Sequence, residues 1–322
     1  YKRQVENRVL NSHFEKIMKK ILPSLLPYLL LSLLVVMWGS AFAALKVSLT
    51  SIPHLWVMSL RLMIGSLTIA IVFLLMKKRL PMTLEFWKWS LIIGILGFSV
   101  PFSIIAWGAQ YIPSSLVAIL MGANPIITLI LAYFLLPNSS LSFRMAVGVF
   151  LGLLGIMLLV GFGNFSSDLY QFQFIYGQLA VLTGTFSFAL ASILLKNSPQ
   201  EHSFERALGS LICGSVIGLF LAYFFSDTSL IISNISFKSL VSIILLGVFP
   251  TGIATVIWFK IIALKGPVFL ALVNYLIPVW ALILGIFLLN EKINYIIGFG
   301  LILITIGAVS YTHLTLPTIL LV

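Results

Sequence analysis

The sequence predicts an all-α integral membrane protein with ten transmembrane helices, arranged as two inverted repeats of five helices each. Three observations carry this prediction: the apolar composition, ten apolar stretches of membrane length, and an internal repeat. The chain has 322 residues, of which 61% are hydrophobic and 8% are charged. A soluble domain is typically about 45–50% apolar and about 25% charged, so no soluble core could hide this much apolar surface.

The ten apolar stretches follow one another with short linkers and no inserted soluble domain. Each has about 20 residues, the length that crosses the hydrocarbon core of a bilayer as a helix. They are residues 25–47, 55–76, 87–109, 114–136, 143–162, 175–195, 205–225, 239–262, 267–289 and 293–311. The fifth ends at Gly161-Phe162-Gly163-Asn164, which is typical of a helix stop. We therefore predict one five-helix repeat over residues 25–162 and a second over residues 175–311.

The repeat shows most clearly in two stretches with a central proline, residues 113–138 and 266–291. Their prolines, Pro125 and Pro278, are 153 positions apart. At this offset Leu129-Ile130-Leu131 and Phe134-Leu135-Leu136 recur as Leu282-Ile283-Leu284 and Phe287-Leu288-Leu289, and Gly94 falls on Gly247. Corresponding helices are five spans apart, an odd number, so the two halves would lie in the membrane with opposite orientation. Inverted repeats of this kind are typical of transporters that work by alternating access.

The distribution of Lys and Arg predicts the orientation. If the amino terminus is cytoplasmic, fifteen of the nineteen basic residues fall in cytoplasmic segments, whereas Lys238 and Lys292 fall outside. Such an excess is the positive-inside pattern of membrane proteins, so it explains the net charge of +11 without nucleic-acid binding. We predict a multi-pass protein of the cell membrane (the inner or plasma membrane) with both termini in the cytoplasm.

Both ends of the chain depart from the pattern of the spans. Residues 1–24 are expected to form a basic cytoplasmic tail, and Met18-Lys19-Lys20 before the first apolar stretch looks like an ordinary start of a membrane protein. Part of this tail is therefore interpreted as upstream sequence that is not native. Residues 312–322 carry no Lys or Arg, unlike a typical cytoplasmic end, and are also interpreted as a tail that is not native.

Several motifs together resemble the drug/metabolite transporter superfamily, and specifically its EamA-type carriers. They are Trp38-Gly39-Ser40-Ala41-Phe42 followed by Lys46, Arg61 early in the second span, and Asn274-Tyr275-Leu276-Ile277-Pro278-Val279 running into Leu288-Leu289-Asn290-Glu291. The first half departs from the family, because Pro137-Asn138 stands where the family usually repeats Gly-Glu. The resemblance implies ten helices in two inverted halves and a central cavity beside the first span.

Six residues are candidates for substrate binding, each with a structural alternative. They are Trp38, Ser40, Asn124, Trp258, Asn274 and Tyr275. Small residues such as Ser40 also allow helices to pack closely, and amides within spans also form bonds between helices. Tryptophan near a span end also anchors proteins at the membrane interface. We expect a central cavity lined by the first, third, fourth, sixth, eighth and ninth spans.

Two prolines are candidates for gating. Pro125 and Pro278 each free a backbone carbonyl one turn back and kink their helix. Such a kink can be static and needed for packing, or it can be the point at which two helix halves move.

Three charged residues lie in or near the membrane: Lys46, Arg61 and Glu291. A guanidinium at span depth costs roughly 2.5–3.5 kcal/mol, so Arg61 is expected to extend outward to water or to pair with backbone carbonyls or a substrate carboxylate. Lys46, at the outer end of its span, is expected to reach the interface. Glu291 lies at the outer end of the ninth span, where it could titrate from the mouth of a cavity.

The residues needed for catalysis are missing at span depth. All eight acidic residues fall in tails, loops or span ends, and no histidine lies at mid-span. The chain has no Gly-rich phosphate loop, and its single cysteine excludes a cysteine metal cluster. We therefore expect no catalytic residues, no metal and no cofactor, and movement of solute down its own gradient without obligatory proton exchange.

These observations favour a secondary transporter, and specifically an exporter, of small organic metabolites such as amino acids. A carrier of anionic phosphorylated or nucleotide-linked solutes is the alternative within transport, and it would need several basic residues in the cavity. An intramembrane enzyme is the alternative from another class, and it would need polar catalytic residues within the spans. The expected partners are a small-molecule solute and the lipid bilayer but no nucleic acid. The sequence leaves the oligomeric state open, and a monomer is compatible with it.

Overall fold

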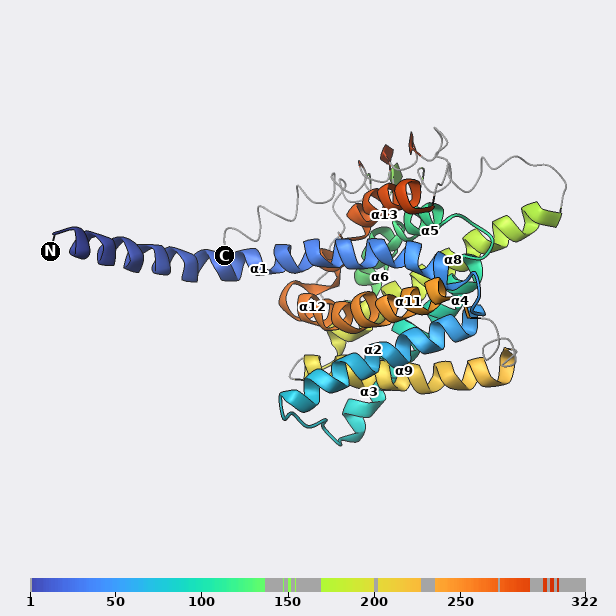
Figure 1. Cartoon of the computed structure of the whole chain (residues 1–322), viewed down its shortest axis with the longest axis horizontal. Helices are drawn as coiled ribbons and strands as arrows, with labels where there is room; N and C mark the ends of the chain where they lie inside the picture. Colours follow the sequence, from blue (N-terminus) through green and yellow to red (C-terminus); the bar gives the residue numbers. More distant parts are fainter. Residues whose placement is uncertain are drawn as a thin grey trace.

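A computed structural model describes residues 2–136, 169–199, 202–226, 235–271 and 273–289, together with isolated positions between 147 and 154 and between 298 and 306. Every regular element in these ranges is helical (Figure 1). The predicted spans 143–162 and 293–311 lie outside the described residues apart from the isolated positions.

Helices cover eight of the predicted spans. The first, second, sixth and seventh spans are single helices: α1 Lys2–Ser48, α2 His54–Leu75, α8 Leu169–Asn197 and α9 Ser203–Phe225. The third consists of α3 Leu84–Gly94, η1 Ile95–Ser99 and α4 Val100–Gly108, and the fourth of α5 Ser114–Met121 and α6 Asn124–Leu135. The eighth and ninth consist of α11 Phe237–Leu246, η2 Gly247–Ile253, α12 Ala254–Ala271 and α13 Val273–Leu289.

Seven described stretches are long and apolar enough to cross a membrane. The longest runs from Phe237 to Leu270, which is 34 residues and more than one crossing needs. Its continuity is interrupted at Gly266, which has φ +83° and ψ 173° inside α12. Glycine adopts this conformation at little steric cost, so the chain can end one helix and begin the next there. The ninth predicted span therefore begins at this kink rather than after a separate loop.

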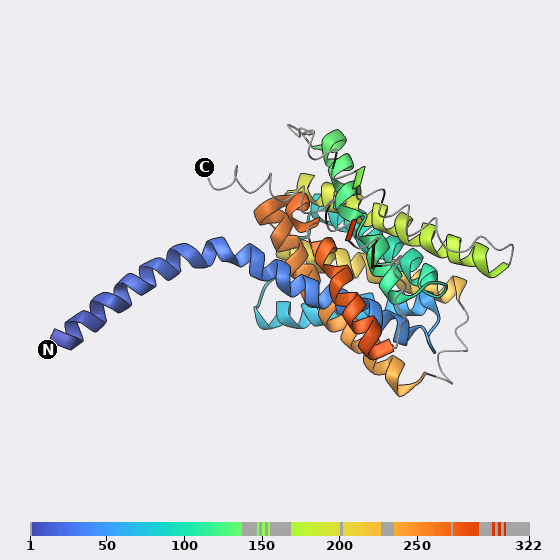
Figure 2. The same ribbon diagram turned by 90° about the horizontal axis from the view of Figure 1, so that it is seen from above.

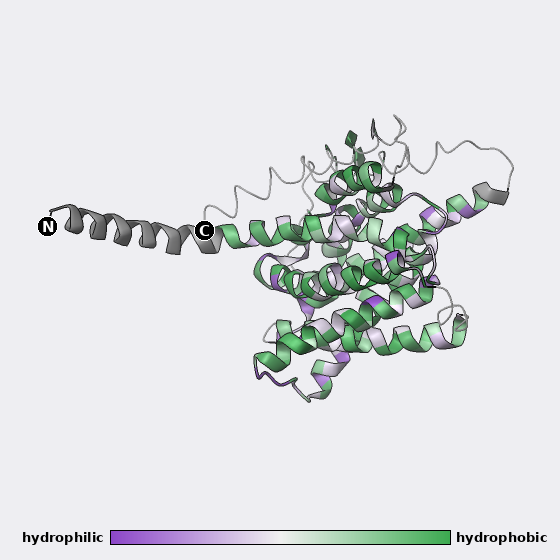
Figure 3. Cartoon of the chain, in the orientation of Figure 1, coloured by the Kyte–Doolittle hydropathy of each residue, from purple (hydrophilic) through white to green (hydrophobic). Residues whose placement is uncertain are grey.

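The long helices lie side by side, with α1 next to α11 and α13, and α2 next to α9 (Figures 1 and 2). The pairs α1–α13, α2–α9 and α4–α8 each join one predicted half of the chain to the other. Apolar residues dominate the helices over most of their length (Figure 3). Large apolar side chains such as Leu67 and Phe225 are 62% and 72% exposed, as expected for a surface that faces lipid.

The third and eighth spans each contain a π-helical turn, η1 and η2. A proline accompanies each turn, Pro101 just after η1 and Pro250 within η2, and proline cannot donate to the carbonyls behind it. Hydroxyl groups bond to the carbonyls in these regions. Ser187 donates to the carbonyl of Leu96 at 2.8 Å, and Thr251 donates to the carbonyl of Leu246 at 2.9 Å. These bonds satisfy backbone groups that lipid could not hydrate.

A pair of hydroxyl residues follows the same pattern at both turns. Ser99 donates to the carbonyl of Gly94, five residues earlier, as Thr251 does to that of Leu246. Four residues later, Ser103 donates to the carbonyl of Ser99, and Thr255 donates to the carbonyl of Thr251. The two pairs are 152 positions apart, one less than the offset of the prolines. The internal similarity of the sequence therefore extends to the local hydrogen bonds of these two spans.

Candidate functional site

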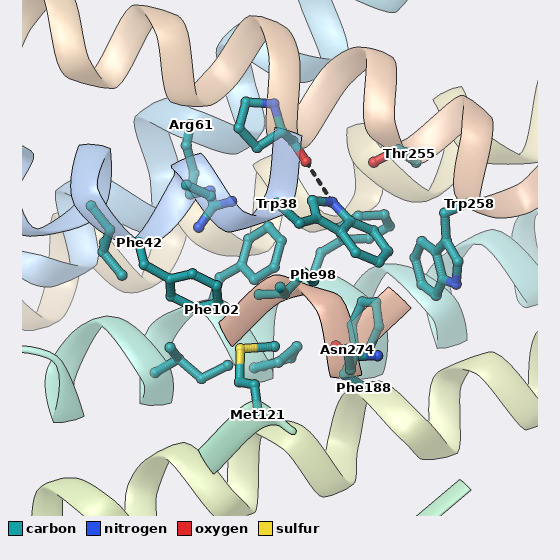
Figure 4. Close-up of a pocket in the computed structure, with 16 residues that line it drawn as sticks. Trp38, Phe42, Arg61, Phe98, Phe102, Met121, Phe188, Thr255, Trp258 and Asn274 are labelled. Atoms are coloured by element: carbon teal, nitrogen blue, oxygen red, sulfur yellow. Dashed lines mark hydrogen bonds between the residues drawn. The ribbon is translucent and has the colours of Figure 1, made fainter. Parts of the chain in front are cut away.

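A cavity of about 60 Å³ lies where α1, α2, α4, α8, α12 and α13 converge, with η1, η2 and α5 completing its wall (Figure 4). Its lining therefore comes from all of the spans that were expected to contribute and also from the second span. The volume is enough for a few water molecules. Most of the lining is apolar, and a small number of polar groups interrupt it.

Aromatic rings form much of the wall. The rings of Phe188 and Trp258 stack with centroids 4.7 Å apart, and Trp38 meets Phe188 edge-on at 5.7 Å. Phe98 packs edge-on against both Trp258 and Phe102, at 5.5 and 5.8 Å. Such contacts hold large rings in fixed positions, so the wall is a preformed apolar surface.

Close packing of α8 and α12 against η1 fixes the position of Trp258. A Cβ atom on Gly97 would lie 2.9 Å from the indole of Trp258, so only glycine leaves room for the ring there. Trp258 is fully buried, and its indole N–H has no hydrogen-bond partner among the described residues. A buried donor without a partner costs about 1–3 kcal/mol, which marks this ring as a point where a polar ligand atom would be stabilised.

Arg61 is the charged side chain of the cavity wall, and it is 8% exposed. Its Nε donates to Oγ1 of Thr251 at 3.1 Å. Its guanidinium lies 3.8 Å from the centre of the Phe102 ring, within the range of a cation–π contact. The side chain therefore points into the cavity instead of extending outward to water (Figure 4).

The remaining polar lining comes from α1, η2, α12 and α13. The indole N–H of Trp38 donates to the carbonyl of Pro250 at 3.1 Å and so joins the first span to the eighth. Thr255 and Asn274 also line the cavity, and Asn274 is 2% exposed. A cavity that is mostly aromatic with few polar groups is typical of a small-molecule site.

Three of the six predicted binding residues, Trp38, Trp258 and Asn274, line this cavity. Ser40 does not, because its hydroxyl donates to the carbonyl of Val36 and accepts the indole N–H of Trp280 at 3.0 Å. Neighbouring Gly39 leaves room for the same indole, since a Cβ there would lie 2.6 Å from it. In this structure Ser40 thus serves the packing of α1 against α13.

Asn124 is not among the residues that line the cavity. Asn124 is 2% exposed, and its side-chain oxygen accepts from the hydroxyl of Thr128 at 2.9 Å within α6. Its amide nitrogen is buried without a partner in the described part of the chain. The side chain of Tyr275 lies outside the described residues.

The helix is interrupted next to one of the two candidate gating prolines and continuous at the other. The fourth span is broken into α5 and α6, and Pro125 is the second residue of α6, where its missing N–H leaves no helical bond unmade. Helix α13 continues across Pro278, whose side chain is not among those described. The break at Gly122 and Ala123 is thus the more pronounced of the two interruptions.

Of the other two charged candidates, Lys46 is described, and it is not among the residues that line the cavity. Nζ of Lys46 donates to the carbonyls of Ala109 and Ile112 at 2.7 and 3.0 Å, so it binds the turn that follows α4. A lysine near a helix C-terminus stabilises the carbonyls that have no intrahelical partner. Glu291 falls outside the described residues.

Sequence reasoning missed most of the aromatic wall. Phe98, Phe102 and Phe188 are ordinary residues in apolar spans, and nothing in their spacing separates a cavity face from a lipid face. The nearest indication was the match of Gly94 with Gly247 at the repeat offset, because both residues begin or adjoin the π-helical turns that border the cavity. Thr255 was also missed, because nothing in its spacing indicates that it faces a cavity.

Comparison with known proteins gives consistent results. The profile of the EamA-like transporter family matches residues 25–161 and again residues 175–312. The uncharacterized transporter YoaV of Bacillus subtilis is 24% identical over 273 residues, which cover 84% of this chain and 91% of the relative. A probable amino-acid metabolite efflux pump of Escherichia coli is 25% identical over 283 residues, covering 85% and 91%.

A solved crystal structure shares the fold. It superposes with a TM-score of 0.67 at 18% sequence identity and covers 89% of this chain and 96% of the other.

Proposed function

The chain belongs to the EamA-like transporter family, and from this premise we propose that it is a secondary transporter that exports small organic metabolites, such as amino acids, by alternating access. The observation that carries the proposal is the cavity. It lies at the meeting point of both predicted halves and is lined by aromatic rings, and its described lining contains one buried cation, Arg61. The name of the Escherichia coli relative favours the same direction and class of solute.

The size of the cavity favours a mechanism with moving helices. Sites for small organic ligands usually have volumes of about 300–1,000 Å³, well above the 60 Å³ of this cavity. A solute would therefore need the surrounding helices to separate. Within the described residues, the spans are least regular at the break between α5 and α6, the kink at Gly266 and the π-helical turns. Regions of irregular helix at membrane depth are typical of transporter binding sites.

Two observations support the proposed division into inverted halves. The family profile matches the chain twice, and the hydroxyl pairs of η1–α4 and η2–α12 recur at nearly the repeat offset. The proposal includes ten crossings, with halves at residues 25–162 and 175–311 and both termini in the cytoplasm. Reporter fusions after Arg79 and after Asp168 test it, and the two reporters should lie on opposite sides of the membrane. Reporters on the same side would contradict the inverted arrangement.

The alternatives have less support. Phosphorylated solutes carry two negative charges, whereas Arg61 is the one basic residue among the described residues that line the cavity. An intramembrane enzyme would place acidic, histidine or cysteine side chains at its reacting centre, and the described lining of this cavity contains none of them.

Counterflow in proteoliposomes tests the function directly. Purified protein is reconstituted into vesicles loaded with one unlabelled metabolite at a time, and uptake of a labelled trace of the same metabolite is followed. Alternating access predicts transient accumulation of label for at least one organic solute, without added nucleotide and without a pH gradient. A panel of amino acids and their derivatives that shows no counterflow at all would contradict the proposal.

A further inference from the structure

We propose that Arg61 binds the carboxylate of a solute whose remaining part is apolar or aromatic. This inference rests on the transport function proposed above and narrows its substrate class to organic monocarboxylates. It depends on the charge balance of the cavity, the geometry of the guanidinium and the chemistry of the wall.

The charge of Arg61 has no anionic partner in the described part of the chain. The ion pair found there joins Lys78 to Glu205 at 3.1 Å, at the cytoplasmic end of the predicted topology. Glu85 and Glu205 are the acids among the residues with described side chains, and neither lines the cavity. A buried guanidinium without a counter-charge is costly, so an arriving anion would be stabilised there.

The geometry leaves the far edge of the guanidinium available. Nε is the one nitrogen of Arg61 with a hydrogen-bond partner among the described residues, namely Oγ1 of Thr251. That hydroxyl is itself fixed, because it donates to the carbonyl of Leu246. Phe102 covers one face of the group. The two terminal nitrogens remain, and a paired set of N–H donors matches the two oxygens of a carboxylate.

The rest of the wall selects the body of the solute. Phe98, Phe188 and Trp258 form a connected aromatic surface, and Figure 4 shows Trp38 between Arg61 and this cluster. An apolar or aromatic group would bury against these rings, which stabilises it by about 25 cal/mol per Å² of apolar area removed from water. A single cation matches a single carboxylate, and the described lining provides no anion to pair with an ammonium group.

The expected specificity follows from this charge balance. Removing the carboxylate from a solute should weaken binding at least tenfold, whereas removing the amino group should not. Phenylalanine and 3-phenylpropanoate should therefore both bind, and 2-phenylethylamine should not. A cation would meet repulsion from Arg61, so organic amines lie outside the predicted class.

Equilibrium binding to the purified protein provides the test, read from quenching of tryptophan fluorescence, since Trp38 and Trp258 line the cavity. The probes are 3-phenylpropanoate, its neutral amide, phenylalanine and 2-phenylethylamine. Wild-type protein should bind the two acids at least tenfold more tightly than the amide or the amine. Arg61→Gln should lose at least tenfold in affinity for the acids and little for the amide. Arg61→Lys should recover part of the loss, because it keeps the charge but not the paired donors.

A matched control removes a cation elsewhere. Lys238→Gln deletes an exposed charge at the start of α11 and should leave all four affinities unchanged. The comparison of probes on wild-type protein does not depend on any variant, so it decides the question even if Arg61→Gln fails to fold. Amine binding as tight as acid binding, or acid binding that is insensitive to Arg61→Gln in folded protein, would overturn the inference. Counterflow separates the two proposals: solutes exchanged without preference for a carboxylate contradict this inference alone, and no exchange of any solute contradicts transport itself.

Discussion

The two π-helical regions share a hydrogen-bonding pattern and differ in the residue that completes it. At η1, the hydroxyl of Ser99 bonds to its own helix and donates to the carbonyl of Gly214 on α9 at 3.2 Å. At η2, the hydroxyl of Thr251 bonds to its own helix and accepts from Arg61 on α2 at 3.1 Å. Arg61 and Gly214 are 153 positions apart, the offset that also aligns Pro125 with Pro278.

Gly214 and Arg61 occupy matching positions, but Gly214 serves helix packing and Arg61 is proposed to bind solute. Gly214 allows α9 to approach η1 closely, and a Cβ on Gly94 would lie 2.9 Å from the carbonyl of Ser210. Arg61 instead projects a long side chain toward the cavity, and close approach of its helix depends on Gly247 in the partner span. Two similar local structures thus produce a tight helix contact at η1 and a charged cavity wall at η2.

Among the substitutions in these two regions, the largest effect on binding is expected from Thr251→Val, which would remove the hydrogen bond between Arg61 and η2. The substitution keeps the shape of the side chain but leaves Nε of the buried Arg61 without a partner. The guanidinium would no longer be held in position, so affinity for 3-phenylpropanoate should fall by about tenfold or more. The lost hydrogen bond to a charged group is worth about 1.5–3 kcal/mol, so the unfolding midpoint should fall as well. Titration by tryptophan fluorescence checks the affinity. Thr251→Ser restores the hydroxyl and should restore the affinity, and a Val variant that binds normally would contradict the role given to Thr251.

A smaller effect, on stability, is expected from Gly247→Ala. The new Cβ would lie 2.5 Å from Cβ of Ile64, so α2 and η2 would have to move apart. Overpacking of this kind costs typically about 1–3 kcal/mol. Thermal unfolding in detergent should show a lower midpoint. Gly298→Ala is the matched control, because no atom of the described residues lies within 4 Å of a Cβ at that position. Equal midpoints for the two variants would mean that the close contact at η2 is not needed.

The sequence predicted part of this arrangement because an internal similarity is visible in an apolar chain, whereas the orientation predicted from the charge asymmetry stays a prediction. The matched prolines identified the spans that meet at the centre, and Trp38, Trp258 and Asn274 do line one cavity. The lining phenylalanines could not be predicted, because almost every position of a membrane span is apolar and no periodicity marks the inner face. Arg61 was recognised as unusual, but its direction depends on Thr251 and Phe102, which lie on other spans.

The smallest effect is expected from Ser99→Ala, which would remove the hydrogen bond between η1 and α9. The bond from Ser99 to Gly214 joins two helices, and such bonds in membranes average about 0.6 kcal/mol and reach about 1.7 kcal/mol. The unfolding midpoint should fall slightly, whereas affinity for 3-phenylpropanoate should stay at the wild-type value. A loss of affinity as large as that of Thr251→Val would show that the two regions do not divide packing from binding.

The central claim is that the solute occupies the aromatic cavity, and protection of a cysteine placed in its wall tests this most directly. Ala41 lines the cavity, so Ala41→Cys is made in a Cys213→Ser background that removes the native thiol. Modification by a water-soluble methanethiosulfonate reagent is followed with and without the solute that exchanges fastest in counterflow. Met82→Cys, at a position that is 83% exposed between α2 and α3, is the control. The structure predicts that solute slows modification at residue 41 and leaves residue 82 unaffected, and equal rates at residue 41 with and without solute would contradict the claim.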